Sequence, residues 1–491
     1  MRHPSTIFIV LSFLAAATLL GENVTSDHQT TIGGKTIRYT AEAGHLNVRL
    51  GPKEPEAQLF FMAYTALPRD PNRPVTFLFN GGPGSSSVWL HMGAFGPKRV
   101  PLDPNGMPVE GRSARAVPNE QSLLDLSDLV FLDPVGTGLS KANPAEDAAK
   151  FQEVRADGEI TVEFIRAYLT REKRWTAPVY IAGESYGTIR ASLVADGLQR
   201  RYSVPVAGVV LISPAINTQV YRTGAGNELP YTLGFPAMSL TAWYHKRVAA
   251  DLQALSFDEM RVRAETFAKA TLAPALYEGA ALPEEERKRV ATEMSRMLGI
   301  SVADILLRDL RIERFDFAQL LLRDQEQTVG VLDGRYIGRP SSEPGVLVAG
   351  DYTYGYSDAS YAVDAVFTSA FKDYLAHELN YPAVEHYEVL SLSTAANWKW
   401  DAARNRYLYT GDTLRAAMTL HPEMKVFVAN GYYDMVTPHL GAEYQVNHLG
   451  LPIALRKNVT LRFYPSGHMM YVHEESMRAM KKDLAAFYRG R

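Results

Sequence analysis

The sequence predicts an α/β fold: a mostly parallel central sheet with helices on both faces, interrupted by a helix-rich insertion. Three observations lead to this expectation. Short apolar runs alternate with helical stretches up to residue 216, the alternation returns after residue 404, and charged helical patterns replace it in between. Strands that alternate with helices form a mostly parallel sheet covered on both sides.

The expected strands are short apolar runs of the kind that lie buried in a parallel sheet. They lie at Val75–Phe79, Leu129–Leu132, Val179–Ala182, Val206–Ile212, Lys425–Ala429 and Val459–Tyr464. Before them, residues 31–65 alternate β-rich runs with Gly, Asn and Pro turns, which predicts antiparallel hairpins at a sheet edge. Helices are expected at Ala145–Thr170, Thr188–Arg201 and Glu474–Tyr488.

The insertion is expected to run from about Asn217 to about Arg404. Its charged patterns predict helices at Glu284–Met297 and Ala303–Arg311. The predicted domain organisation is therefore an α/β core in two parts, residues 22–216 and 405–491, with a helix-rich cap at residues 217–404 between them.

The N-terminus has the pattern of a secretory signal peptide over residues 1–21. Arg2 and His3 precede an apolar run from Ile7 to Leu20, which is short for a membrane-spanning helix. An uncleaved anchor is the alternative. We expect an exported protein, periplasmic or extracellular, with no membrane partner after signal removal. The chain has no cysteine, which suits a bacterial periplasm better than a eukaryotic secretory route.

The composition excludes several other classes of protein. The net charge is −3, from 51 basic and 54 acidic residues. The chain thus lacks the excess of positive charge that binding to nucleic acid or to an anionic membrane requires. The sequence contains neither an H-E-x-x-H pattern nor a set of His and Cys residues with the spacing of metal ligands, so no motif predicts a metal site. We expect neither a metal nor a cofactor, and the sequence does not predict the oligomeric state.

The segment Gly183-Glu184-Ser185-Tyr186-Gly187 matches the pattern G-x-S-x-G. A predicted strand leads into it and a predicted helix leads out, as in the nucleophile elbow of the α/β-hydrolase fold. The glycines allow the tight turn that holds the serine hydroxyl clear of the backbone. Ser185 is thus the candidate nucleophile. The alternative is a glycine-rich connection in which the serine is incidental.

A serine hydroxyl needs a base beside it, and this fold supplies its partners in the order Ser, Asp, His. Asp434 follows the predicted strand that ends at Ala429, and His468 follows the one that ends at Tyr464. Loops at the carboxyl ends of parallel strands gather at one edge of the sheet. We therefore expect His468 to act as the base and Asp434 to orient it. A structural histidine is the alternative for His468.

A glycine-rich loop, Asn80-Gly81-Gly82-Pro83-Gly84, follows the predicted strand at Val75–Phe79. Acyl transfer needs backbone N–H groups that hold the developing oxyanion. Gly82 and Tyr186, the residue after the nucleophile, are the expected pair. A phosphate-binding loop is the alternative, but the G-x-G-x-x-G pattern is absent here.

Together these segments resemble the serine carboxypeptidase family. The resemblance covers most of the chain after the signal peptide. It depends on residues 80–87, on Asp133-Pro134-Val135-Gly136-Thr137-Gly138-Leu139-Ser140, on residues 183–187, on Asn430-Gly431 with Asp434, and on Gly467-His468-Met469. It implies a Ser185, Asp434 and His468 triad, Gly82 and Tyr186 as oxyanion donors, and a peptide substrate with a free C-terminus.

The resemblance also implies that Asn80, Gly81 and Glu184 bind the terminal carboxylate of the peptide. A glutamate can donate a hydrogen bond only when it is protonated. Like-charge repulsion from a bound carboxylate should raise the pKa of Glu184. Peptide cleavage is therefore expected to be best on the acid side of neutral pH.

Two positions depart from the family pattern. The family usually has a second glutamate ten residues after the last glycine of the loop, where this chain has Ala94. A cysteine often follows the catalytic Asp by three residues, where this chain has Thr437, and this change is expected to alter only packing. The first departure leaves open an esterase or acyltransferase with the same triad. A non-catalytic binding protein is a third hypothesis.

Overall fold

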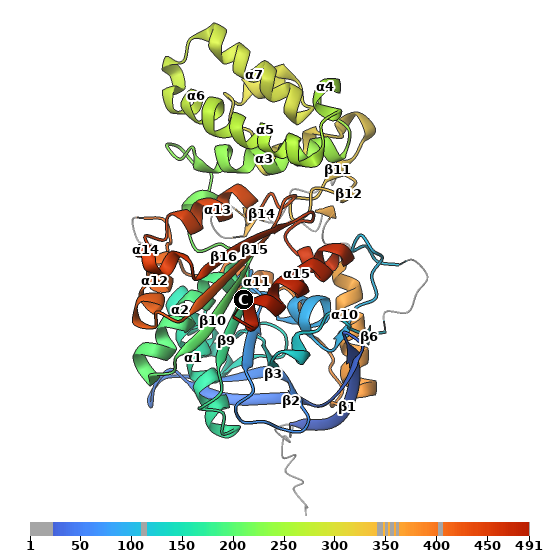
Figure 1. Cartoon of the computed structure of the whole chain (residues 1–491), viewed down its shortest axis with the longest axis vertical. Helices are drawn as coiled ribbons and strands as arrows, with labels where there is room; N and C mark the ends of the chain where they lie inside the picture. The colour runs from blue at the N-terminus through green and yellow to red at the C-terminus, as the bar shows by residue number, and fades with distance from the viewer. Residues whose placement is uncertain are drawn as a thin grey trace, which may run out of the picture.

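The computed structural model describes residues 23–109, 115–340, 347–348, 352–353, 358–359, 363–400 and 406–490. The predicted signal peptide, residues 1–21, lies outside the described residues. Within the described part of the chain, no helix is long and apolar enough to cross a bilayer. Figure 1 shows a body built around a twisted sheet and a lobe of helices above it.

A ten-stranded mixed sheet forms the body. Its antiparallel edge is β1 (Val24–Ile32), β2 (Lys35–Arg49) and β3 (Glu56–Ala66), with β8 (Lys141–Asn143) beside β3. The parallel part follows in the order β7 (Asp128–Leu132), β4 (Val75–Phe79), β9 (Val179–Glu184), β10 (Val206–Ile212), β15 (Lys425–Gly431) and β16 (Val459–Tyr464). The predicted strands and the antiparallel edge are confirmed.

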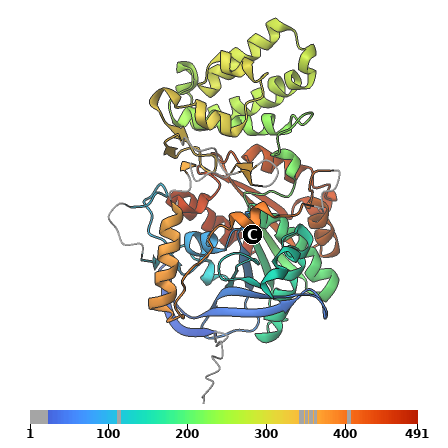
Figure 2. The same ribbon diagram turned by 180° about the vertical axis from the view of Figure 1, so that it is seen from behind.

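Helices cover both faces of the sheet because side chains alternate along each strand. Phe77 and Phe79 of β4 pack with α1 (Val154–Arg171), α2 (Tyr186–Tyr202) and α12 (Gly411–Leu420). Leu78 faces the other side, with α10 (Asp364–Asp373), α15 (Glu474–Tyr488) and the π-helix η1 (Trp89–Phe95). Figure 2 shows α10 beside the body, away from the lobe. The predicted α/β fold is confirmed.

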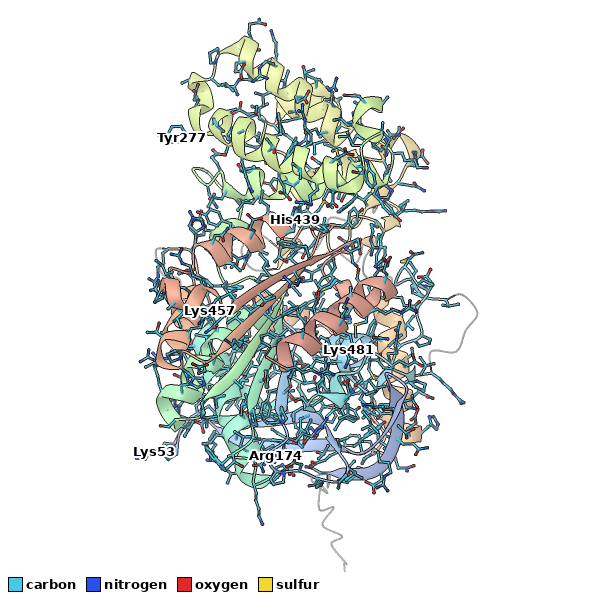
Figure 3. The ribbon with its side chains drawn as sticks, viewed as in Figure 1. Lys53, Arg174, Tyr277, His439, Lys457 and Lys481 are labelled. Carbon is cyan, nitrogen blue, oxygen red and sulfur yellow. The ribbon has the colours of Figure 1, made fainter. Side chains whose placement is uncertain are left out.

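The lobe consists of α3 (Leu229–Tyr244), α4 (Ala250–Gln253), α5 (Phe257–Phe267), α6 (Ala273–Glu278), α7 (Glu284–Leu298), α8 (Val302–Leu307) and α9 (Arg314–Leu320). Its core includes Tyr186 and Met435, which follow the carboxyl ends of β9 and β15. Figure 3 places His439 where the lobe meets the body and Tyr277 on the lobe far from it. The cap boundaries at residues 217 and 404 stay a prediction.

The remaining α-helices and β-strands are short. They are α11 (Leu392–Ala396), α13 (His439–Asn447), α14 (Ile453–Arg456), β5 (Lys98–Arg99), β6 (Val117–Pro118), β11 (Thr328–Val329), β12 (Ile337–Gly338), β13 (Leu347–Val348) and β14 (Tyr352–Thr353).

Two helix predictions were wrong in their extent. The helix expected at Ala303–Arg311 ends at Leu307, because Asp309 and Leu310 adopt positive φ angles of 50° and 67°. The helix expected at Ala145–Thr170 is a 3₁₀ segment followed by α1. Between these two, the carbonyl of Gln152 accepts a 2.9 Å hydrogen bond from the backbone N–H of Lys399. A contact this distant in the sequence leaves no local pattern.

Candidate active site

Ser185 occupies a sharp turn between β9 and α2. Its φ and ψ angles are 56° and −125°, a conformation that costs energy for any residue with a side chain. The turn is tight, since a Cβ on Gly183 would lie 2.1 Å from the carbonyl oxygen of Gly187. The backbone N–H of Ser185 donates a 2.9 Å hydrogen bond to the carbonyl of Ile212, at the end of β10. This is the geometry of a nucleophile elbow.

Asp434 and His468 lie in contact at the carboxyl ends of β15 and β16. His468 Nδ1 is 2.8 Å from Asp434 Oδ2. The other carboxylate oxygen, Oδ1, accepts hydrogen bonds from the backbone N–H groups of Val436 at 2.8 Å and Thr437 at 2.9 Å. Both partners are buried. An ionised Asp434 in this position can hold the His468 imidazole in the tautomer whose Nε2 is free to accept a proton.

Both Ser185 and His468 are anchored to the end of β10. Ile212 accepts the hydrogen bond from Ser185, and the Ser213 hydroxyl donates at 2.8 Å to the carbonyl of His468. Adjacent residues of one buried strand end thus hold the two loops. The structure thereby places His468 in contact with Asp434, and it ties the turn at Ser185 and the loop of His468 to the same strand end.

The pKa of His468 lies above its usual value of 6.5. Burial alone would lower it, because the charged imidazolium is poorly solvated there. The carboxylate of Asp434 outweighs this effect, and the more distant Glu184 also favours the charged form. His468 is therefore suited to receive a proton during a reaction.

Thr437 takes part in the contact between Asp434 and His468. Its hydroxyl lies 2.7 Å from Asp434 Oδ2 and 3.2 Å from His468 Nδ1. The expectation that Thr437 affects only packing was wrong. A hydroxyl three residues after the acid can donate to the carboxylate at a tight turn.

The glycine-rich loop lies against the elbow. A Cβ on Gly81 would be 2.5 Å from the backbone nitrogen of Tyr186, so only glycine fits this approach. Tyr186 is the first residue of α2, where N–H groups lack acceptors within the helix. Gly82 follows with a φ of 100°. The structure thus brings the predicted oxyanion donors, Gly82 and Tyr186, to neighbouring backbone segments.

A buried ion pair supports this loop. Arg190 of α2 donates from Nη1 to the carbonyl of Asn80 at 2.7 Å, and its Nε lies 2.9 Å from Asp157 Oδ2. Arg190 has no exposed surface. The sequence analysis missed both charged residues. The signal was present in Arg190, since a charge on the apolar face of a predicted helix requires a buried partner.

Glu184 is buried beside Ser185 and accepts two hydrogen bonds on one oxygen. Asn80 Nδ2 lies 2.5 Å and the Tyr471 hydroxyl 2.7 Å from Glu184 Oε2. Asn80 is itself held, because its Oδ1 accepts from the backbone N–H of Leu90 at 2.9 Å. Burial raises the pKa of Glu184 to about 7, against the opposing effect of His468 and both hydrogen bonds.

Tyr471 is the third site residue that the sequence analysis missed. It lies three residues after His468, and a Cβ on Gly93 would be 2.9 Å from its ring. The neighbouring Ala94, where the family pattern has an acid, is fully buried. Glu184 thus has an amide and a phenol as partners instead of a second carboxyl group.

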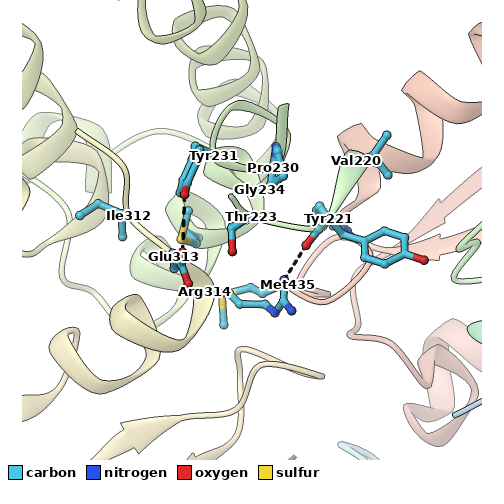
Figure 4. A pocket seen from close by; sticks show the side chains of 12 residues that line it. Val220, Tyr221, Thr223, Pro230, Tyr231, Gly234, Ile312, Glu313, Arg314 and Met435 are labelled. Carbon is cyan, nitrogen blue, oxygen red and sulfur yellow. Dashed lines mark hydrogen bonds between the residues drawn. The ribbon is translucent and has the colours of Figure 1, made fainter. Parts of the chain in front are cut away.

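The lobe reaches the loop that carries Asp434. Figure 4 shows a small pocket between them, lined by Tyr231 and Glu313 of the lobe and by Met435. At its edge, Arg314 Nη1 donates a 3.0 Å hydrogen bond to the carbonyl of Tyr221. In the described part of the chain, no group of three acidic or histidine side chains could hold a metal ion.

The sheet order and the strand-to-helix turn at Ser185 define the protein as an α/β-hydrolase. The chain is similar in fold to the prohormone-processing carboxypeptidase Kex1Δp from Saccharomyces cerevisiae, with a TM-score of 0.55 at 14% identity over 92% of this chain and 91% of that one. The family model "Serine carboxypeptidase" matches residues 33–272, so this part of the chain is similar to the serine carboxypeptidase family.

Two curated relatives come from Arabidopsis thaliana. Serine carboxypeptidase-like 33 is 31% identical over 166 residues, which is 33% of this chain and 32% of that protein. Serine carboxypeptidase-like 35 is 28% identical over 155 residues, 31% of this chain and 30% of that protein. The matches thus span about a third of the length of these relatives.

Proposed function

We propose that the protein is a serine-type carboxypeptidase that hydrolyses the C-terminal peptide bond of peptides. Ser185 attacks the scissile carbonyl while His468 accepts its proton, and Asp434 stabilises the imidazolium that forms. The N–H groups of Gly82 and Tyr186 hold the oxyanion. His468 then gives the proton to the leaving amine, and water hydrolyses the acyl-enzyme by the same route.

The observation that carries the proposal is the buried pair of Asn80 and Glu184 next to the nucleophile. A carboxyl group with a pKa of about 7 is largely protonated below neutral pH and can donate to a carboxylate. The Gly81 N–H and the Asn80 amide supply further donors. Esterases that bind no substrate carboxylate have no need for a neutral acid beside the nucleophile.

The further proposal is that residues 1–21 direct export to the periplasm or the outside of the cell.

The test compares a peptide acid with the matching peptide amide. A charge-assisted hydrogen bond contributes about 1.5–3 kcal/mol, so the amide should be roughly 10- to 150-fold poorer in kcat/KM. Because Ala94 supplies no second acid, the lower part of this range is expected. Asn80→Ala should reduce the discrimination between the two.

Ser185→Ala is the control and should abolish both turnover and labelling by a fluorophosphonate. Equal rates for acid and amide in the wild type would refute the carboxypeptidase and leave a general serine hydrolase. They would favour the second candidate, an esterase or acyltransferase, for which the alanine at position 94 is the supporting observation. An unlabelled wild type would favour a non-catalytic binding protein.

A further inference from the structure

Residues 331–334, which we call the bridge segment, join the two loops that carry Asp434 and His468. The segment is buried and follows the last lobe helix, α9, and strand β11. It forms four hydrogen bonds with these loops: Met435 N to Val331 O at 3.0 Å, Gly334 N to Tyr433 O at 3.0 Å, His468 N to Leu332 O at 2.7 Å, and Gly467 N to Asp333 Oδ2 at 2.9 Å.

The bonds divide evenly between the two loops. Tyr433 and Met435 flank the acid, whereas His468 is the proposed base itself and Gly467 precedes it. The two loops also contact each other directly, since Tyr433 N donates to the carbonyl of Ser466 at 3.0 Å. The bridge segment therefore fixes a pair of loops that already touch, at the residues closest to the acid and the base.

Of the four hydrogen bonds, only the one from the Gly467 N–H is made to a side chain, the carboxylate of Asp333. Arg335 holds this carboxylate in place. Arg335 lies 2.6 Å from Oδ2, and both its side-chain Nε and its backbone N–H donate to Oδ1. Arg335 also donates to the Ser466 hydroxyl at 3.0 Å, on the same loop as His468. A Cβ on Gly467 would be 2.4 Å from the Cβ of Asp333, so the approach requires glycine.

We propose that Asp333 is a positioning residue, which fixes the His468 loop against Asp434 and thereby makes the insertion part of the catalytic machinery. This inference rests on the proposed function of the triad. Asp333 touches no reacting atom in this role and acts through Gly467 and His468. The charged groups that face His468 are Asp434 and Glu184.

The experiment measures the rate of Ser185 labelling by a fluorophosphonate as a function of pH, which requires no peptide substrate. Asp333→Ala removes the acceptor for Gly467 and should slow labelling roughly 10- to 100-fold, as small misplacements of catalytic groups do. The pH midpoint should fall toward 6.5, because His468 moves away from Asp434. Asp333→Asn keeps an oxygen acceptor for Gly467 and should stay within about threefold of the wild type.

Asp128→Ala is the matched control. Asp128 is also buried, accepts a backbone hydrogen bond from Ala66 at 3.0 Å and pairs with Arg174 at 2.6 Å, but it lies at the amino end of β7, opposite the site. This variant should lower the melting temperature and leave the labelling rate and its pH midpoint unchanged in the folded protein.

Each outcome decides the question. A wild type that is not labelled contradicts the proposed function, whereas a labelled wild type with an identical Asp333→Ala profile contradicts only the role of Asp333. Equal losses in Asp333→Asn and Asp333→Ala would mean that the ion pair matters and not the bond to Gly467. If Asp333→Ala does not fold, Asp333→Leu replaces it: leucine is similar in size to aspartate but offers Gly467 no acceptor, and an unchanged pH midpoint would overturn the inference.

Discussion

The hydroxyl of Tyr471 donates a 2.7 Å hydrogen bond to Oε2 of Glu184, the oxygen that also accepts from Asn80. A phenol in this position favours the ionised carboxylate. Tyr471→Phe should therefore raise the pKa of Glu184. We expect the alkaline limb of peptide cleavage to move upward by about one pH unit or less, with the profile for ester substrates unchanged.

The control for Tyr471→Phe is Tyr464→Phe. Tyr464 also donates to a carboxylate, Asp483, at 2.9 Å, but this pair lies on α15 and β16 outside the site. It should leave both profiles unchanged. An unshifted peptide limb in Tyr471→Phe would mean that the phenol does not influence the acid that binds substrate.

The pH profiles of peptide and ester cleavage should differ because they depend on different groups. Both need neutral His468, so both rates rise as the pH passes its raised pKa. Only the peptide also needs protonated Glu184, so only its rate falls again above a pKa of about 7. The raised pKa values of both groups move the expected peptide maximum from the acid side toward neutral pH. The measurement is kcat/KM for a matched peptide and ester from pH 5 to 9.

Glu184→Gln tests the origin of the falling limb, because a glutamine side chain donates at every pH. This variant should lose the alkaline fall for peptides while the rising limb remains. Coincident peptide and ester profiles in the wild type would contradict the assignment of Glu184.

Thr437→Val should lower kcat more than it changes KM. The substitution removes the hydroxyl that lies 2.7 Å from Asp434 Oδ2, so the carboxylate loses one of the donors that orient it toward His468. A hydrogen bond to a charged group contributes about 1.5–3 kcal/mol, which corresponds to a loss of roughly 10-fold or more in kcat. Thr437→Ser retains the hydroxyl and should restore most of the activity; equal rates in the two variants would refute this role.

Much of the site could be predicted because its chemistry needs particular residues at particular points of the chain. The turn at Ser185 requires glycines on both sides, and these glycines form a recognisable sequence motif. The acid and the base had to follow strands of a parallel sheet, and Asp434 and His468 do. Their mutual contact at 2.8 Å agrees with this reasoning.

Supporting residues were hidden because their roles depend on contacts between distant segments. Asp333 follows the lobe helix α9 in the sequence and meets Gly467, 134 positions later, only in the folded chain. Tyr471 reaches Glu184 across 287 positions of sequence. Neither residue belongs to a local pattern, and a lone tyrosine or aspartate in a loop has many ordinary structural uses.

The sequence alone therefore determined the α/β order of strands and helices and the identity of the candidate triad, since both depend on periodicity and on short segments. Only the tertiary structure decided which partners hold Glu184 and that Thr437 joins the contact between acid and base. It also decided that helix α8 ends at Leu307. These outcomes depend on burial and on the approach of backbones that are far apart in the chain. Neither quantity is defined until the sheet, the helices and the lobe have packed together.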